Sequence, residues 1–266
     1  MFLHRTDGAS YLIPQVSHAW LAWQIASHWG NRAFSRPAPR AEVLAAVLLH
    51  DGGWSEADAH PELDADGRPL TFDRMPSARR LEIWRSSVLR AAMHCRYAGL
   101  LVSHHFAVMA ADASSSALAG GDTDAARRTE AFRAEMERLQ AAWREDLAED
   151  ARYQAYLDGP GWLANTVLLR ACDRVSVWLC ARLESPFTVD GHTAAGKGRA
   201  VRLEAVGGDR WKVSPWPLQG DRIRLQCEGW RLPEAEAASG RSLHDIVKAG
   251  PATRLSFTLL RPSARG

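Results

Sequence analysis

The dipeptide His50-Asp51 closes an apolar run, AEVLAAVLLHDGGW, that has the composition of a buried helix. An imidazole and a carboxylate at the buried end of a helix lose hydration, and this cost must be offset by a partner of opposite charge. A divalent metal ion is such a partner, and the helix dipole favours a cation at this end. Adjacent helical residues diverge by roughly 100°, so both reach one ion only where the chain turns away, as at Gly52-Gly53.

Four further residues extend this pattern. His18 precedes the pair in a tryptophan-rich predicted helix, a His-His pair follows it, and Asp173 lies in a later helix that is apolar nearly all the way round. His18, Asp173 and the dipeptide offer a mixed nitrogen and oxygen shell. Such a shell suits Mn, Fe, Mg or Zn, with positions left for water.

Each of these residues also has an ordinary structural explanation. Asp173 has arginines beside it on its own helix, and Arg170, three residues earlier, is a suitable salt-bridge partner, with Arg174 as the other. His18 taken alone is more typical of a satisfied core histidine. A second His-Asp dipeptide at 244–245 has no supporting ligands, and we expect it to be a surface pair.

The spacing of the later histidines indicates which of them can reach the predicted metal site. His94 and His105 are three helical turns apart on one face, which is roughly 16 Å in a straight helix. Paired catalytic metals lie only about 3.5–4 Å apart. At most one of the two therefore reaches the centre unless Gly99 breaks the helix. His104 and His105 point in different directions, and we favour His105, with His104 second.

The long loop after the dipeptide offers residues that would shape a pocket. Trp54, Asp58 and Phe72 are the candidates there, with His104 from the later helix. Ordinary loop anchors and turn acids explain the loop residues equally well.

Composition limits the function classes. The chain has 266 residues, 46% hydrophobic and 24% charged, as in an ordinary globular protein. The net charge of +2 comes without a basic cluster, which argues against nucleic acid as a partner. No apolar run is long enough to span a bilayer, the N-terminus lacks an apolar leader, and the four cysteines form no C-x-x-C pair. We expect a cytoplasmic protein with a small-molecule partner and no membrane association.

The pattern of elements predicts a mainly α protein. Residues 2–13 are typical of a short hairpin, and helical periodicity covers about 14–29, 40–50, 77–106 (bent at Gly99), 123–147 and 162–183. From residue 185, alternating β-type runs dominate, with a short helix near Leu243. We therefore predict a helical bundle over 1–184, a short N-terminal hairpin, and a small β-rich C-terminal appendage over 185–266.

The ordered motifs resemble a known superfamily. They are QVSHA at 15–19, HDGGW at 50–54, Phe72, LLVSHH at 100–105 and CDRVSVWLC at 172–180. Together they are similar to the HD-domain superfamily of metal-dependent phosphohydrolases, and most similar to an uncharacterised bacterial branch known only by a domain-of-unknown-function label. The resemblance implies an HD-like helical bundle in which a divalent metal is held by His18, His50, Asp51 and Asp173. It places His105 near a second metal or the substrate.

The leading hypothesis is a metal-dependent hydrolase of a small phosphorylated substrate that uses metal-activated water. Asp51 would be a metal ligand, and His105 a general acid or phosphate contact. The first alternative is an HD-type diiron oxygenase, which requires two of His94, His104 and His105. The second is a non-catalytic ligand-binding or sensory module with the β-rich tail as an interaction surface.

Overall fold

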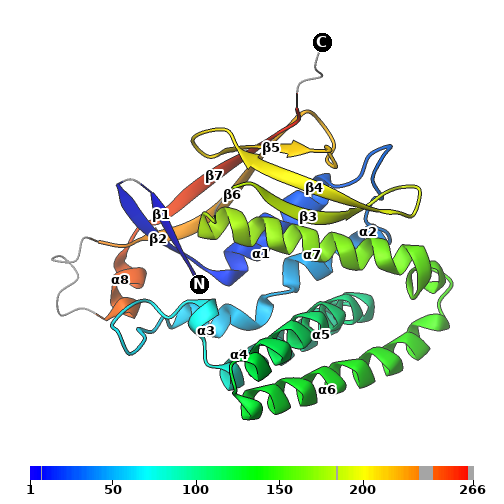
Figure 1. Ribbon diagram of the computed structural model, residues 1–266, viewed down its shortest axis with the longest axis horizontal. Coiled ribbons are helices and arrows are strands. Elements are labelled where there is room, and N and C mark those ends of the chain that lie inside the picture. The colour runs from blue at the N-terminus through cyan, green and yellow to red at the C-terminus, as the bar shows by residue number, and fades with distance from the viewer. Residues whose placement is uncertain (7, 184, 234–241, 263–266) are drawn as a thin grey trace.

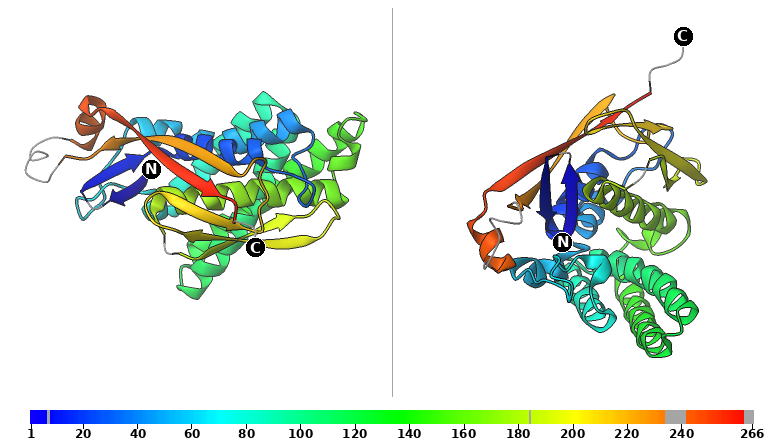
Figure 2. Two further views of the ribbon diagram at one scale, coloured as in Figure 1. Left: turned by 90° about the horizontal axis from the view of Figure 1, so that it is seen from above. Right: turned by 60° about the vertical axis from the view of Figure 1, so that its left-hand side comes forward.

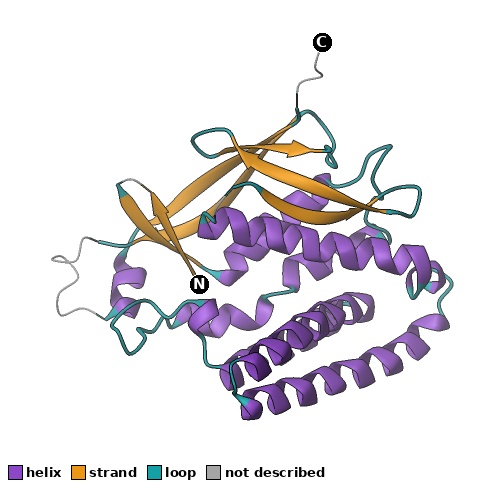
Figure 3. Ribbon diagram, viewed as in Figure 1, coloured by secondary structure: helices purple, strands orange, loops and turns teal. Residues whose placement is uncertain are grey.

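The computed structural model describes residues 1–6, 8–183, 185–233 and 242–262. A curled sheet covers one side of the molecule, and the helices lie beneath it in two layers (Figure 1). The helices α1 and α7 lie against the sheet, whereas α5 and α6 lie farthest from it (Figure 3). The site described below lies among the helices.

The sheet has seven strands in the order β1-β2-β6-β7-β5-β4-β3. Neighbouring strands are antiparallel except β5 and β7, which are parallel. Their alternating buried and exposed residues turn one face toward the helices. The strands are β1 (Phe2–Thr6), β2 (Ala9–Ile13), β3 (Phe187–His192), β4 (Gly198–Ala205), β5 (Arg210–Ser214), β6 (Arg222–Arg231) and β7 (Ala252–Leu260).

The prediction of a mainly α fold with a small β-rich appendage is wrong, because the protein is mixed α/β with one large sheet. The N-terminal hairpin belongs to that sheet: β2 pairs with β6 through Tyr11 with Arg231 and Leu12 with Trp230. Two further views show the hairpin continuing the sheet (Figure 2). The hairpin was predicted correctly from local alternation. Its pairing with β6 could not be predicted from a local pattern, because β6 lies more than two hundred residues away in the sequence.

The helices follow the predicted periodicity, and two helical stretches were not predicted. The small-residue stretch after His105 is helical to Ala119, and the loop after the His-Asp dipeptide contains a short helix at Ser55–Ala59. The α-helices are α1 (Gln15–His28), α2 (Arg40–Leu49), α3 (Ser55–Ala59), α4 (Ser77–His94), α5 (Arg96–Ala119), α6 (Thr123–Ala148), α7 (Gly159–Ala181) and α8 (Leu243–Ala249), with 3₁₀ turns η1 (Gly52–Trp54), η2 (Phe72–Arg74) and η3 (Gln154–Tyr156).

The predicted bend at Gly99 lies four residues earlier. Cys95 is extended, with φ −156° and ψ 146°, and its sulfur accepts a hydrogen bond from the Ala98 amide at the start of α5. Gly99 instead allows α4 and α5 to approach, because a Cβ atom there would lie 2.5 Å from the Cβ of Ala92. The break separates His94, at the exposed end of α4, from His105 within α5.

One hydrophobic core joins the helical segment to the C-terminal strands. Trp178 of α7 stacks on Phe187 with 5.3 Å between ring centroids, and its ring meets Trp211 of β5 edge-on at 5.9 Å. The strands therefore bury the face of α7 that the other helices leave uncovered. The division into domains at residue 185 stays a prediction.

Across the described ranges, none of the helices combines the length and apolarity that crossing a membrane requires.

Gly53 fixes the turn that follows the His-Asp dipeptide against α4. Its amide donates a hydrogen bond of 2.9 Å to the Ser87 hydroxyl, and a Cβ atom at this position would overlap the carbonyl oxygen of Ile83. Neither Gly52 nor Gly53 has a positive φ. Gly53 is therefore needed for the close approach between η1 and α4.

We expect Gly53→Ala to destabilise the protein by about 1–3 kcal/mol, the usual cost of overpacking a tight contact. Gly52→Ala is the matched control, because its Cβ would meet only the flexible Arg90 side chain at 3.6 Å. Urea unfolding of both variants measures the difference. Equal stability of the two variants would contradict the close-approach explanation.

Candidate metal centre

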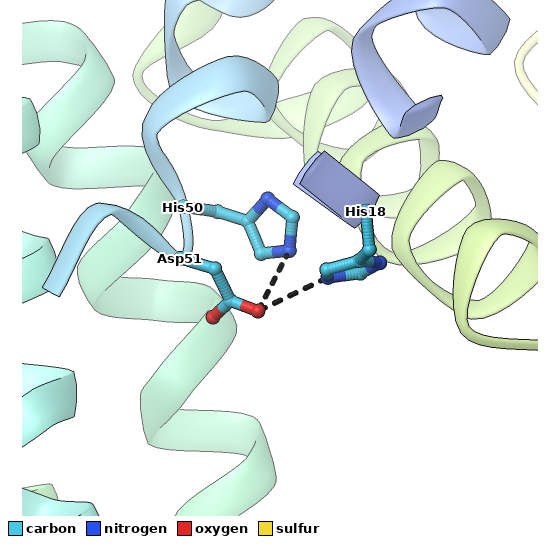
Figure 4. A group of neighbouring side chains, drawn as sticks. All are labelled: His18, His50 and Asp51. Atoms are coloured by element: carbon cyan, nitrogen blue, oxygen red, sulfur yellow. Dashed lines mark hydrogen bonds and ion pairs between the residues drawn. The ribbon is translucent and has the colours of Figure 1, made fainter. Parts of the chain in front are cut away.

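Three buried side chains from two segments converge between α1 and the end of α2 (Figure 4). His18 lies in α1, His50 caps the C-terminal end of α2, and Asp51 follows it before η1. Their relative exposures are 0%, 1% and 7%. One potential ligand atom from each lies within 4.8 Å of the others, so this group could hold a metal ion.

The distances suit a common ion. The Oδ2 atom of Asp51 is 3.0 Å from Nε2 of His18 and 3.7 Å from Nε2 of His50. From α7, the Oδ1 atom of Asp173 is 3.6 Å and 3.3 Å from the same two nitrogens. Two ligands bound at about 2.0–2.2 Å to one ion lie about 2.8–3.6 Å apart at tetrahedral or adjacent octahedral angles. The measured separations lie in or just outside this range, and Asp173 is a candidate fourth ligand for the ion that His18, His50 and Asp51 could hold.

Hydrogen bonds on the far side of each ring determine which imidazole nitrogens face the position of such an ion. The Nδ1 atom of His50 lies 2.7 Å from the Val47 carbonyl oxygen, which can only accept, so Nδ1 carries the proton. The Ser176 hydroxyl donates to the Asp173 carbonyl and therefore accepts from Nδ1 of His18 at 2.8 Å. In its neutral form, Nε2 of His50 presents a lone pair inward, as a metal ligand requires. Nε2 of His18 hydrogen-bonds Oδ2 of Asp51 at 3.0 Å, and because a carboxylate only accepts, this nitrogen must give up its proton before it can bind a metal.

The electrostatics show how the group balances its charge without an ion. Burial disfavours the protonated form of His50, but the carboxylates of Asp51 and Asp173 outweigh it and raise the pKa of His50 to about 9. Burial would raise the pKa of Asp51, yet His50 and His18 hold it below its ordinary value. The pKa of Asp173 is lowered well below its ordinary value for the same reason, despite burial. The positive charge of protonated His50 thus offsets the charges of the two carboxylates.

His50 also carries an unsatisfied atom. Its Nε2 is buried and has no hydrogen-bond partner of suitable geometry, although it lies near two carboxylates. An orphaned buried nitrogen of this kind costs free energy. When the ring is neutral this nitrogen carries a lone pair, which a cation between it and the carboxylates would satisfy, so the donor set fits a divalent metal.

His105 approaches from α5. Its Nε2 atom lies 3.6 Å from Oδ2 of Asp173, the carboxylate oxygen that does not face His50. Burial lowers the pKa of His105 to about 4, so the imidazole is neutral at pH 7. It can act there as a ligand or as a hydrogen-bond donor.

Two other predicted histidine positions lie outside this group. His94 is exposed at the end of α4, and His104 packs edge-on against Trp162 with 5.1 Å between ring centroids. The salt bridge considered for Asp173 does not form. Arg170 lies 3.7 Å from Asp112 instead, and Arg174 lies over the Phe187 ring.

The second His-Asp dipeptide lies away from the group. His244 stacks on His60, with 5.5 Å between ring centroids. The Asp245 carboxylate accepts a hydrogen bond from the Ser242 hydroxyl, and the Asp245 amide donates one to the same hydroxyl oxygen.

A cavity of about 520 Å³ opens beside the candidate metal centre. Trp54 and Phe72, two of the candidate pocket residues, are among its lining residues. Asp58 does not line it but accepts hydrogen bonds from the Gln15 and Val16 amides at the start of α1. His104 also lies outside it. The remaining lining residues are Phe2, Gln15, His18, Asp51, Asp73, Arg80, Trp84, His105, Met109, Ala113, Ser116, Ala117, Asp173 and Val177.

Sequence reasoning missed three residues of this site. Ser176 follows Asp173 by three positions and so shares its helix face, a signal that was available from periodicity. Gln15 and Arg80 also line the cavity, but nothing in the sequence distinguishes Arg80 from its neighbour Arg79.

The fold and the site define a mixed α/β protein with a buried histidine and aspartate group able to hold a metal ion. The chain belongs to the family described as "Protein of unknown function (DUF3891)", whose model matches residues 1–234. The match includes every residue of the site. Neither the curated proteins nor the solved structures gave a significant match.

We expect Asp51→Asn to abolish metal binding, because it removes a ligand charge while keeping the side-chain shape. Plasma mass spectrometry should find near-stoichiometric metal in the wild type and about a tenth of that or less in the variant. Metal at about 100 times its Kd should stabilise only the wild type, by about 2.7 kcal/mol. Asp124→Asn, on the exposed face of α6, is the control. Equal metal content in both variants would exclude this site.

Stability of the chelator-treated protein should fall as pH rises. His50 titrates near 6.5 when unfolded and near 9 when folded, so its stabilising proton is retained below about pH 6.5 and lost through about pH 9. Metal binding requires the neutral ring, so stabilisation by added metal should increase over the same range.

Thermal unfolding from about pH 6 to about pH 9.5 measures both effects. His50→Gln should flatten the pH dependence, and the exposed-residue control His94→Gln should retain it. A chelated wild type with pH-independent stability would overturn the assignment of charge to His50.

Proposed function

We propose that the protein is a metal-dependent hydrolase of a small phosphorylated substrate. His18, His50, Asp51 and Asp173 would hold a divalent cation. The observation that carries the proposal is the convergence of two inward-facing Nε2 atoms and two carboxylates at one wall of a cavity, with Nε2 of His50 unsatisfied.

A bound divalent cation would supply Lewis acidity and lower the pKa of a coordinated water molecule, which generates a nucleophile near neutral pH. The chain's own residues position the reaction. Ser176 and the Val47 carbonyl fix the ring orientations of His18 and His50. Both carboxylates are ionised because the imidazoles lower their pKa values.

His105 is the residue we assign to proton transfer or phosphate contact. It lines the cavity, it is neutral at pH 7, and its Nε2 faces the outer oxygen of Asp173. A neutral imidazole can donate its ring N–H to a leaving-group oxygen or a phosphate oxygen.

We infer a phosphorylated substrate partly because the ordered motifs resemble the HD-domain superfamily. The family match itself gives no support for this resemblance. The cavity volume lies within the range of about 300–1,000 Å³ that is typical of small-molecule sites. The diiron oxygenase alternative has less support, because it needs two of His94, His104 and His105 and only His105 lies near the other ligands.

We expect metal-dependent turnover of at least one member of a panel of phosphomonoesters, phosphodiesters and nucleotides. His105→Gln should lower kcat by about 10²–10⁴-fold, the usual contribution of general acid–base catalysis, while the bound metal stays unchanged. His94→Gln should leave kcat unchanged.

A kcat for His105→Gln equal to that of the wild type would remove the role of His105. Absence of turnover across the panel in protein shown to contain metal would overturn the hydrolase, and unaltered cellular function of Asp51→Asn would favour a non-catalytic module.

A further inference from the structure

Arg80, at the start of α4, is a cation without an anionic partner on the cavity wall. Its Nε atom is buried and has no hydrogen-bond partner, and no carboxylate among the described residues pairs with it. The arginines nearby on the helix are paired: Arg79 makes two hydrogen bonds of 2.8 Å with Glu62, and Arg85 bonds Glu135 at 2.8 Å. Arg80 therefore differs from Arg79 and Arg85, because no carboxylate among the described residues pairs with its guanidinium group.

The guanidinium is held in place by an aromatic ring. The Cζ atom of Arg80 lies 5.4 Å from the centroid of Trp84, one turn further along α4. Burial lowers the pKa of Arg80, which reflects the cost of taking its charge out of water. An oxyanion in the cavity would offset this cost and satisfy Nε, and guanidinium groups match the geometry of phosphate.

A hydrogen-bond acceptor without a partner lies at the same cavity. The Oε1 atom of Gln15 is buried and unpartnered, while its main chain is fixed by the hydrogen bond to Asp58 at the start of α1. The exposed carboxylate of Asp73 also lines the cavity. These acceptors favour a ligand that carries a hydroxyl or amino group beside its anionic group.

The remaining wall is apolar, with Phe2, Trp54, Phe72 and Met109 around the cavity. A volume of about 520 Å³ holds a small organic molecule. The wall that carries His18, Asp51, His105 and Asp173 belongs to the same cavity as Arg80, so one small ligand can contact both.

We propose that Arg80 binds the phosphate group of a small hydroxylated or aminated phosphate ester, and that Gln15 Oε1 accepts a hydrogen bond from the hydroxyl or amino group of that ester. The identification of this ligand as a substrate rests on the proposed function. The anion site itself rests on Arg80 and its surroundings.

The test is isothermal titration calorimetry with inorganic phosphate, on protein as purified and after chelator treatment. Arg80→Gln should weaken phosphate binding about 10-fold to 100-fold, the loss expected for hydrogen bonds to a charged group. Arg79→Gln removes the same charge from the adjacent position and should bind phosphate within about twofold of the wild type. Arg80→Lys, which keeps the charge but loses the planar fork, should fall between Arg80→Gln and the wild type.

The Gln15 contact is tested with glycerol phosphate. Gln15→Leu should weaken binding of glycerol phosphate and leave binding of inorganic phosphate unchanged. Equal loss for both ligands, or no loss for either, would overturn the role of Gln15.

Failure of this inference and failure of the metal proposal give different results. If Arg80→Gln binds phosphate as the wild type does, or if the wild type binds none, the anion site is refuted, whatever the metal content. If the purified protein contains no metal and the chelator changes nothing while Arg80 dependence persists, the anion site stands and the metal centre is refuted.

Discussion

Two carboxylates, Asp51 and Asp173, approach the same imidazole nitrogen of His18 from different segments, at 3.0 and 3.6 Å. The charges of the two largely buried carboxylates repel each other, and a positive charge beside them offsets this repulsion. Either a proton on His50 or a metal ion supplies this positive charge. The arrangement of α1, α2 and α7 around these side chains is constrained by this charge balance, since losing one carboxylate or one imidazole leaves the others uncompensated.

The sheet fixes the two helices that carry His18 and Asp173. The side chain of Gln24 on α1 exchanges two hydrogen bonds with the backbone of Gln226 in β6, at 2.7 and 3.0 Å. On α7, the carbonyl of Cys180 lies 2.8 Å from the imidazole of His4 in β1. The strands therefore position the candidate metal centre indirectly, by holding α1 and α7, although the four candidate ligands lie outside the strands. This gives the C-terminal strands a structural role in the site.

The cavity brings together opposite electrostatic preferences. Its acidic wall favours a cation, whereas Arg80 favours an anion, and aromatic side chains form part of the remaining lining. Because hydrogen bonds and charges act more strongly where water is excluded, a ligand with an anionic group beside a metal would satisfy both walls. Ser176 and the Val47 carbonyl contribute by fixing ring orientations before any ligand arrives.

Local sequence determined the elements and the chemical types of the site. Periodicity identified α1, α2, α6 and α7, alternation identified β1, β2 and most of the C-terminal strands, and the cost of burying His50 and Asp51 indicated a cation. Tertiary structure decided what pairs with what. The strand partner of β2 and the unpaired state of Arg80 depend on residues distant in the chain. Periodicity reports only which face of an element is buried, and a buried face does not specify the neighbour that covers it.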